Sequence, residues 1–157
     1  MEAIIYIIIF ITGTFFGSFY TLATYRIPKH QDITHTRSYC PKCDHKLGFF
    51  DMFPVLSYIF LGGKCRYCKN KISPRYLILE VLSGLVFVGI FSLFRFDIYN
   101  LTINNLIQFG FIALAISYLF ITVWIYIENK KIMKSVNIYG ICVAILYIVY
   151  LCILRFA

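Results

Sequence analysis

The sequence predicts an all-α polytopic membrane protein with about four transmembrane helices and one small polar insert. Of its 157 residues, 61% are hydrophobic and 19% are aromatic, whereas a soluble domain is about half apolar. The apolar residues gather in long runs, each of a length that can cross a bilayer. All four prolines fall between residues 26 and 75, so the helix-breaking residues are confined to the insert.

The first apolar span covers residues 3–25, which is long enough to cross the hydrocarbon core with some tilt. It lacks the basic start and the small-residue cleavage site of a signal peptide, so we expect residues 1–25 to be retained as the first transmembrane helix. Gly13 and Gly17 have the small-xxx-small spacing that lets a second helix approach closely. Two tolerated glycines fit the same spacing equally well.

The insert, residues 26–76, is polar and basic. Residues 26–75 contain ten Lys and Arg residues against three Asp residues, a net charge of +7. Beside apolar spans, this excess predicts a cytoplasmic loop under the positive-inside rule. The basic residues are scattered rather than clustered on one helix face, so we do not expect nucleic acid as a partner.

Two Cys-x-x-Cys pairs, separated by 21 residues, predict a four-thiolate zinc site in this insert. Its ligands would be Cys40, Cys43, Cys65 and Cys68. Four thiolates close the coordination shell, so the metal would organise the insert and leave no position open for chemistry. The alternative is a pair of disulfides or unrelated thiols, which a reducing cytosol disfavours. The other two cysteines, Cys142 and Cys152, lie in the last apolar run and are expected to be inert packing residues.

Two features near the membrane leave alternatives open. The 49–61 stretch is apolar but too short to span a bilayer, and it is interrupted by Asp51 and Pro54. It is expected either to lie on the membrane interface or to pack on the metal-binding turns. A second span, residues 77–94, contains Glu80 one turn inside. An acid at this depth faces protein, water or a cation, or else extends its carboxylate to the interface.

Two further spans complete residues 77–157, at about 106–127 and 137–154. The turn at 128–136 carries a net charge of +2, whereas the 95–105 loop is neutral. With the N-terminus outside, both basic loops lie in the cytoplasm and the C-terminus lies outside. We therefore expect a multi-pass protein of the inner, or cytoplasmic, membrane, in contact with lipid.

Several segments resemble bacterial type IV prepilin peptidases. The resemblance begins with Gly17-Ser-Phe-Tyr-Thr-Leu-Ala-Thr-Tyr-Arg-Ile-Pro28 at the exit of the first helix. It continues through the two cysteine pairs, Asp51-Met-Phe-Pro-Val-Leu-Ser-Tyr58 and Lys71-Ile-Ser-Pro-Arg-Tyr76. It covers roughly residues 13–90 in register, and continues more weakly to about residue 140.

The resemblance implies an enzyme that removes the leader of prepilins and methylates the new N-terminus with S-adenosylmethionine. Family members cleave with two intramembrane aspartates, one in a pattern like Phe-Ile-Asp followed by Ile-Pro-Asp or Ile-Pro-Asn, the other in a Gly-x-Gly-Asp motif. Paired carboxylates suit this reaction because one can hold a proton while the other activates water.

The sequence departs from the family at the first of these aspartates. Tyr126 stands at its position, and Met133 and Lys134 replace the following Pro-Asp or Pro-Asn. No Gly-x-Gly-Asp occurs in the 157 residues. A tyrosine, with an ordinary pKa of about 10, supplies no carboxylate at neutral pH. We therefore assign no catalytic residue, and residues 77–157 are interpreted as a remnant of the peptidase region.

Three functions remain open on these observations. In the first hypothesis, the chain is an accessory protein that recognises a prepilin or pseudopilin and pairs with a full-length peptidase or with itself. Alternatively, it retains N-methyltransferase activity, with S-adenosylmethionine as its cofactor beside zinc. In the third hypothesis it is an active or split leader peptidase that cleaves with a partner chain, or a decaying gene product.

Overall fold

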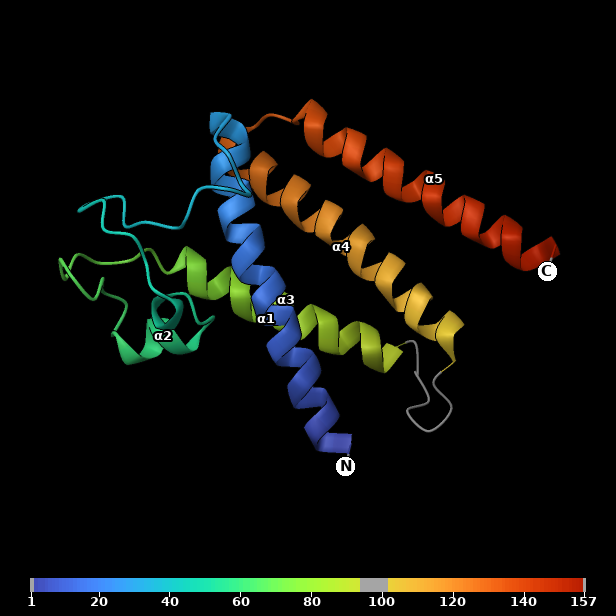
Figure 1. Ribbon diagram of the computed structural model, residues 1–157, viewed down its shortest axis with the longest axis horizontal. Helices are drawn as coiled ribbons and strands as arrows, with labels where there is room; N and C mark the ends of the chain where they lie inside the picture. The colour runs from blue at the N-terminus through green and yellow to red at the C-terminus, as the bar shows by residue number, and fades with distance from the viewer. Residues whose placement is uncertain (1, 94–101, 157) are drawn as a thin grey trace. The chain divides into compact units, whose positions relative to one another are not determined.

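The computed structural model describes residues 2–93 and 102–156, so most of the predicted 95–105 loop lies outside the described residues. Helices account for most of the described chain, and no strand longer than an isolated bridge is found within it (Figure 1). The elements in chain order are α1 (Glu2–Arg26), η1 (Ile27–Lys29), η2 (Phe49–Asp51), α2 (Leu56–Phe60), α3 (Arg75–Leu93), α4 (Ile103–Asn129) and α5 (Lys134–Phe156).

The predicted membrane-spanning architecture is confirmed. Among the described residues, four helices are long and apolar enough to cross a membrane, namely α1, α3, α4 and α5. α1, α4 and α5 extend one to three residues beyond their predicted spans at each end, because a helix can continue past its apolar run. α3 begins two residues before its predicted span, whose expected end at residue 94 lies outside the described residues. α4 begins after Thr102, whose hydroxyl accepts a hydrogen bond from the Asn105 N–H. It ends where Lys130 adopts a left-handed conformation.

The chain forms two compact units, Met1–Phe94 and Arg95–Ala157. In the first, α1 and α3 run antiparallel and in close contact. A Cβ placed on Gly17 would lie 2.7 Å from the Cα of Glu80, and one on Gly13 would lie 2.8 Å from the Cα of Gly84. No side chain fits at either glycine without separating the helices. The small-xxx-small pattern is therefore a helix contact rather than a pair of tolerated glycines.

Aromatic and small polar side chains fill the rest of the α1–α3 contact. The Phe16 and Phe87 rings stack with centroids 5.1 Å apart, and Tyr20 is fully buried. Thr24 is buried, and its hydroxyl oxygen accepts a hydrogen bond from the guanidinium of Arg75. The two ends of the insert are thus joined directly, since α1 leads into it and α3 leads out of it.

Arg26 fixes the first loop of the insert to the end of α1. Its guanidinium is buried and donates to the backbone carbonyls of Asp32 and Thr36, both at 2.8 Å, and of Arg37 at 3.2 Å. Within the same loop, the carboxylate of Asp32 accepts hydrogen bonds from the backbone N–H groups of residues 34–36. These bonds, the one from Thr34 above all, hold the pKa of Asp32 well below its usual range.

The second unit is an antiparallel pair, α4 and α5, in which tyrosines mediate much of the contact. Gly140 on α5 lies against the ring of Tyr118, whose hydroxyl donates to the side-chain oxygen of Asn137 at 3.4 Å. The hydroxyl of Tyr139 donates to the Leu114 carbonyl at 3.2 Å. Cys142 and Cys152 are exposed on α5 within this unit, and the expectation that they are inert packing residues stays a prediction. Their apolar run faces outward, as a lipid-facing helix surface does.

Candidate metal centre

The two cysteine pairs lie in two turns of the same construction. In the first, Cys40 N–H donates to the His45 carbonyl, and the N–H of Asp44, a residue with positive φ, donates to the Cys40 carbonyl. In the second, Cys65 N–H donates to Asn70, and Lys69 repeats the conformation and bond of Asp44. Isolated bridges, Tyr39 with Lys46 and Lys64 with Lys71, close both turns. Each turn thus directs its two thiols to the same side.

The four thiols converge on one point. The Sγ atoms of Cys40, Cys43, Cys65 and Cys68 all lie within 4.8 Å of one another, and those of Cys40 and Cys68 are 3.8 Å apart. Four sulfurs at about 2.3 Å from a tetrahedral ion would be separated by about 3.8 Å. Cys40 and Cys65 are buried, Cys68 is half-buried and Cys43 is exposed. The donor set and its spacing therefore fit a metal ion such as zinc.

Without a bound cation, the thiols of Cys43 and Cys68 do not lose their protons over the same pH range. The backbone N–H of Asn70 and the neighbouring thiols outweigh burial and lower the pKa of Cys68 to about 7. For Cys43, a backbone bond from His45 lowers the pKa, but burial and the thiols of Cys68 and Cys40 prevail and raise it to about 12. Four thiolates in contact need a cation to balance their charge.

A carboxylate braces the second turn from outside the metal cluster. Asp51, whose side chain is only 6% exposed, accepts from Arg66 Nε at 2.5 Å, from the Tyr67 hydroxyl at 3.1 Å and from the Gly48 N–H at 3.0 Å. Burial opposes its ionisation, but these three donors, led by Arg66, lower its pKa. Tyr67 in turn lies against the ring of His45 in the first turn, with ring centroids 3.6 Å apart.

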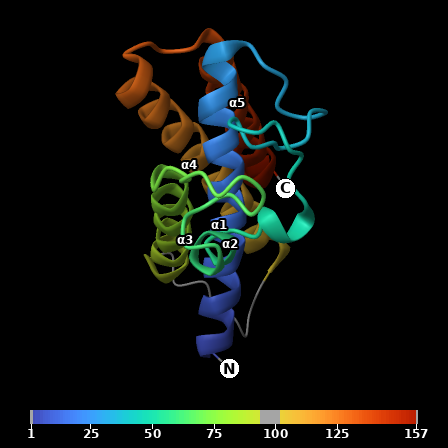
Figure 2. The same ribbon diagram turned by 90° about the vertical axis from the view of Figure 1, so that its left-hand side faces the viewer.

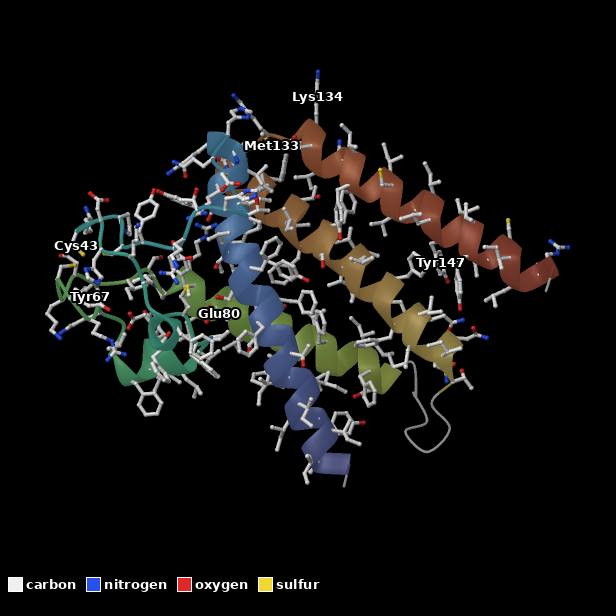
Figure 3. All side chains as sticks on the ribbon, in the orientation of Figure 1. Cys43, Tyr67, Glu80, Met133, Lys134 and Tyr147 are labelled. Atoms are coloured by element: carbon white, nitrogen blue, oxygen red, sulfur yellow. The ribbon has the colours of Figure 1, made fainter. Side chains whose placement is uncertain are left out.

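Asp51 therefore links the 49–61 stretch to the second cysteine turn directly and to the first through Tyr67. The sequence alone gave no reason to rank Asp51 as functional or structural, because Arg66 and Tyr67 lie 15 and 16 residues away along the chain. The only sequence sign was an isolated acid in an apolar run. Figure 3 shows Cys43 and Tyr67 close together in this part of the insert.

The sequence left open whether Glu80 is turned toward a partner or extends its carboxylate to the membrane interface. In the structure its side chain faces protein. It is 8% exposed, and its Oε2 accepts a hydrogen bond from the Val55 N–H at 2.7 Å. Val55 has a φ of 61°, a conformation that is unusual for a β-branched residue. Glu80 thus ties the insert to α3 at a strained position just before α2.

The residues at the degenerate aspartate motif lie in the second unit. Tyr126 is 51% exposed near the end of α4, and the ammonium of Lys130 lies 5.6 Å from the centre of its ring. Met133 and Lys134 lie at the turn into α5 (Figure 3). The nearby acid Glu128 accepts a hydrogen bond from the Trp124 indole at 2.8 Å. The structure therefore brings the cysteines together but groups no carboxylate with Tyr126 in the described hydrogen bonds.

Comparison with known proteins places the metal centre in a family. Residues 11–94 match the model of the bacterial peptidase A24 N-terminal domain. The chain is 34% identical to a prepilin leader peptidase/N-methyltransferase of Vibrio cholerae over 147 residues, covering 75% of this chain and 58% of that protein. Proteins of the same name from Myxococcus xanthus and Bacillus subtilis are 40% and 41% identical, over 52% of this chain and over 24% and 33% of their own lengths.

No solved structure matches the chain. The matched family domain contains α1 from residue 11 onward, the cysteine turns, Asp51, Glu80 and α3, so it includes every feature of the candidate metal centre described above. The chain spans 58% or less of the length of these three relatives. Through this N-terminal domain, the chain belongs to the bacterial A24, or prepilin, peptidase family.

Proposed function

We propose that this protein takes part in the processing of type IV prepilins or pseudopilins as an inner-membrane accessory protein that recognises the substrate and does not itself cut the leader. The observation that carries the proposal is a contrast within the chain. The cysteine insert and its helix pair are intact, whereas Tyr126 stands where the family has a catalytic aspartate. A phenol cannot share a proton with a second carboxylate at neutral pH as a catalytic pair does.

The insert is the proposed recognition element, with zinc held by Cys40, Cys43, Cys65 and Cys68. The closed thiolate shell supports a structural rather than a catalytic metal. The net charges of the 26–75 and 128–136 loops support a cytoplasmic insert with both termini outside. A full-length prepilin peptidase, or a second copy of this chain, is the proposed protein partner.

Two other functions keep specific support. Retained N-methyl transfer from S-adenosylmethionine is supported by the match of residues 11–94 to the N-terminal domain of the family. A split or active leader peptidase is supported by the match to the Vibrio cholerae relative, which extends over 75% of this chain. In that case a partner chain supplies the missing carboxylate.

The deciding experiment incubates the purified full chain in lipid vesicles with a prepilin, with and without S-adenosylmethionine and with and without a full-length prepilin peptidase. The accessory proposal expects an intact leader with the chain alone, prepilin retained on the vesicles, and cleavage only when the peptidase is added. Cys40→Ser should lose the prepilin while Cys142→Ser should keep it.

Each alternative has its own outcome in the same experiment. Efficient cleavage by the chain alone overturns the accessory proposal. Transfer of the labelled methyl group to a mature pilin, without the peptidase, establishes the methyltransferase. If the unmodified chain restores cleavage to a peptidase fragment that carries the family's aspartates but lacks its own N-terminal domain, the chain is half of a split enzyme.

A further inference from the structure

The 49–61 stretch lies alongside the spanning helices rather than beyond their ends. Phe53 contacts the ring of Phe15 on α1, with centroids 5.5 Å apart. Phe15 precedes Arg26, the last residue of α1, by 11 residues, or about 16 Å of helix. Figures 1 and 2, which are related by a rotation about the vertical axis, both place α2 at the height of the middle of α1.

The start of α3 sets the level of this stretch in a bilayer. Arg75 is the first residue of α3, and a charged residue at the start of a spanning helix lies at the hydrocarbon boundary. Glu80 then lies about 7.5 Å inside that boundary, and Val55 is bonded to it.

The stretch is polar toward the protein and apolar on its outer side. Asp51 is turned toward Arg66 and Tyr67, and the Tyr58 ring covers Gly63. Large apolar side chains on the other side are exposed, with fractions of 83% for Phe60, 77% for Phe50, 68% for Phe49 and 60% for Ile59. So many large apolar groups in one short stretch indicate a binding surface rather than a water-exposed loop.

A low-dielectric surrounding favours a segment whose backbone polar groups are paired internally, and about half of the N–H groups of this stretch have a local backbone partner. Local bonds satisfy the N–H groups of residues 51, 52, 56, 57, 59 and 61. Residue 54 is a proline and has no N–H to satisfy. The N–H of Val55 donates to Glu80, so an acid that is costly inside a membrane adds one more of these bonds.

We propose that residues 49–61 form a re-entrant segment that inserts its apolar side among the acyl chains of one leaflet, on the side of the membrane that holds the insert. Glu80 and Phe15 anchor it to α3 and α1. The cysteine turns and the basic residues of the insert stay at the level of the lipid headgroups, where their net positive charge favours anionic lipid. This inference rests on the helix pair spanning a membrane and is independent of the proposed role in prepilin processing.

Tryptophan quenching by brominated lipid tests the proposal, because the chain has a single tryptophan, Trp124. In a Trp124→Phe background, Phe60→Trp places the probe on the proposed membrane side, and Phe50→Trp serves as a second probe should the first fail to fold. The control is His35→Trp, on the exposed loop that Arg26 holds at the end of α1. The full-length variants are reconstituted in phosphatidylglycerol–phosphatidylcholine vesicles whose acyl chains carry bromine.

We expect brominated chains to quench Phe60→Trp and Phe50→Trp several-fold more strongly than His35→Trp. Aqueous acrylamide should give the opposite order. Two results overturn the proposal. Equal quenching of all three by acrylamide places the stretch in water. A blue-shifted emission that brominated lipid does not quench means that another protein surface or a second copy covers it.

Discussion

The two helix pairs of this protein are built in different ways. In α1–α3, glycines bring backbone against backbone, and polar links from Arg26, Glu80 and Asp51 hold the insert in place. In α4–α5, a tyrosine ring lies against a glycine, and tyrosine hydroxyls make long hydrogen bonds of 3.2–3.4 Å across the pair.

The difference indicates where geometry matters to the function. A contact between backbones cannot adjust, whereas a tyrosine ring can rotate and let its neighbour move. The cysteine cluster needs its four sulfurs in one arrangement, and it is supported by the pair of the first kind. The degenerate aspartate motif lies on the pair of the second kind.

Removing the metal should give the largest difference between the two units. Cys40→Ser takes away a buried thiolate ligand, and a structural zinc site of this type binds through all four sulfurs. We expect zinc to fall from about one per chain to almost none, because metal binding and folding of such turns are coupled. The insert should become sensitive to protease while α4 and α5 remain helical.

Elemental analysis of the purified protein and limited proteolysis measure this. Cys142→Ser, which changes an exposed thiol on α5, should keep its zinc and its resistance to protease. Unchanged zinc content in Cys40→Ser would disprove the four-thiolate site.

A methyl group added at each helix contact tests the packing difference directly. In Gly17→Ala the new carbon meets the Cα of Glu80 at 2.7 Å, so the helices must separate, at a cost of about 1–3 kcal/mol. In Gly140→Ala it meets the Tyr118 ring at 2.6 Å. That ring can turn away, and the better helix propensity of alanine offsets about 1 kcal/mol of any remaining steric cost.

Reversible unfolding in mixed micelles should therefore show a clear loss of stability for Gly17→Ala and little change for Gly140→Ala. Gly89→Ala, where nothing lies within 4 Å of the new carbon, controls for propensity in α3. Equal losses for Gly17→Ala and Gly140→Ala would remove the distinction between the two pairs.

The hydrogen bond between Glu80 and Val55 should contribute less to the free energy of unfolding than the α1–α3 contact as a whole. Glu80→Leu leaves the Val55 N–H without an acceptor in a low-dielectric position, which costs about 1–3 kcal/mol. Glu80→Gln retains a side-chain carbonyl and should recover most of the loss.

Hydrogen exchange at the Val55 amide is the direct measurement, and protection should decrease in Glu80→Leu and persist in Glu80→Gln. Glu128→Gln, at an exposed acid near the end of α4, should leave global stability almost unchanged. Persistent protection of Val55 in Glu80→Leu would show that another group satisfies this amide.

Particular residues explain how far the sequence could predict this structure. The spans follow from apolar runs, and the candidate metal ligands follow from the spacing of Cys40, Cys43, Cys65 and Cys68, because both are local patterns. Gly13 and Gly17 indicated a helix contact but not which helix, since that depends on Gly84 and Glu80, which lie 71 and 63 residues later in the chain.

The bonds of Asp51 and Glu80 could not be predicted from the sequence for the same reason. Both acids stood out as polar residues in apolar surroundings, but their partners, Arg66 and Val55, are defined only by the folded insert. A local pattern shows that a buried acid needs partners, and only the tertiary structure supplies them.

The smallest effect we expect is a difference in pH dependence between two capping groups. In the first unit, the Asp32 carboxylate accepts from the backbone N–H groups of residues 34–36, and its pKa lies below its ordinary value of 3.8. A carboxyl whose pKa is lowered in the folded state stabilises the fold at pH values above its ordinary pKa. That stabilisation is lost as the pH falls through the folded-state pKa. In the second unit, the cap of α4 is the neutral hydroxyl of Thr102.

Hydrogen exchange, corrected for the intrinsic rate at each pH, should therefore show protection of the amides of residues 34–36 decreasing below about pH 4. The Asn105 amide should keep its protection over the same range, because the hydroxyl that accepts from it does not titrate there. Asp32→Asn should make the first loop equally insensitive to pH, at a lower level of protection. A parallel decrease at both sites would mean that acid loosens the whole chain, and the carboxylate links would then not distinguish the first unit from the second.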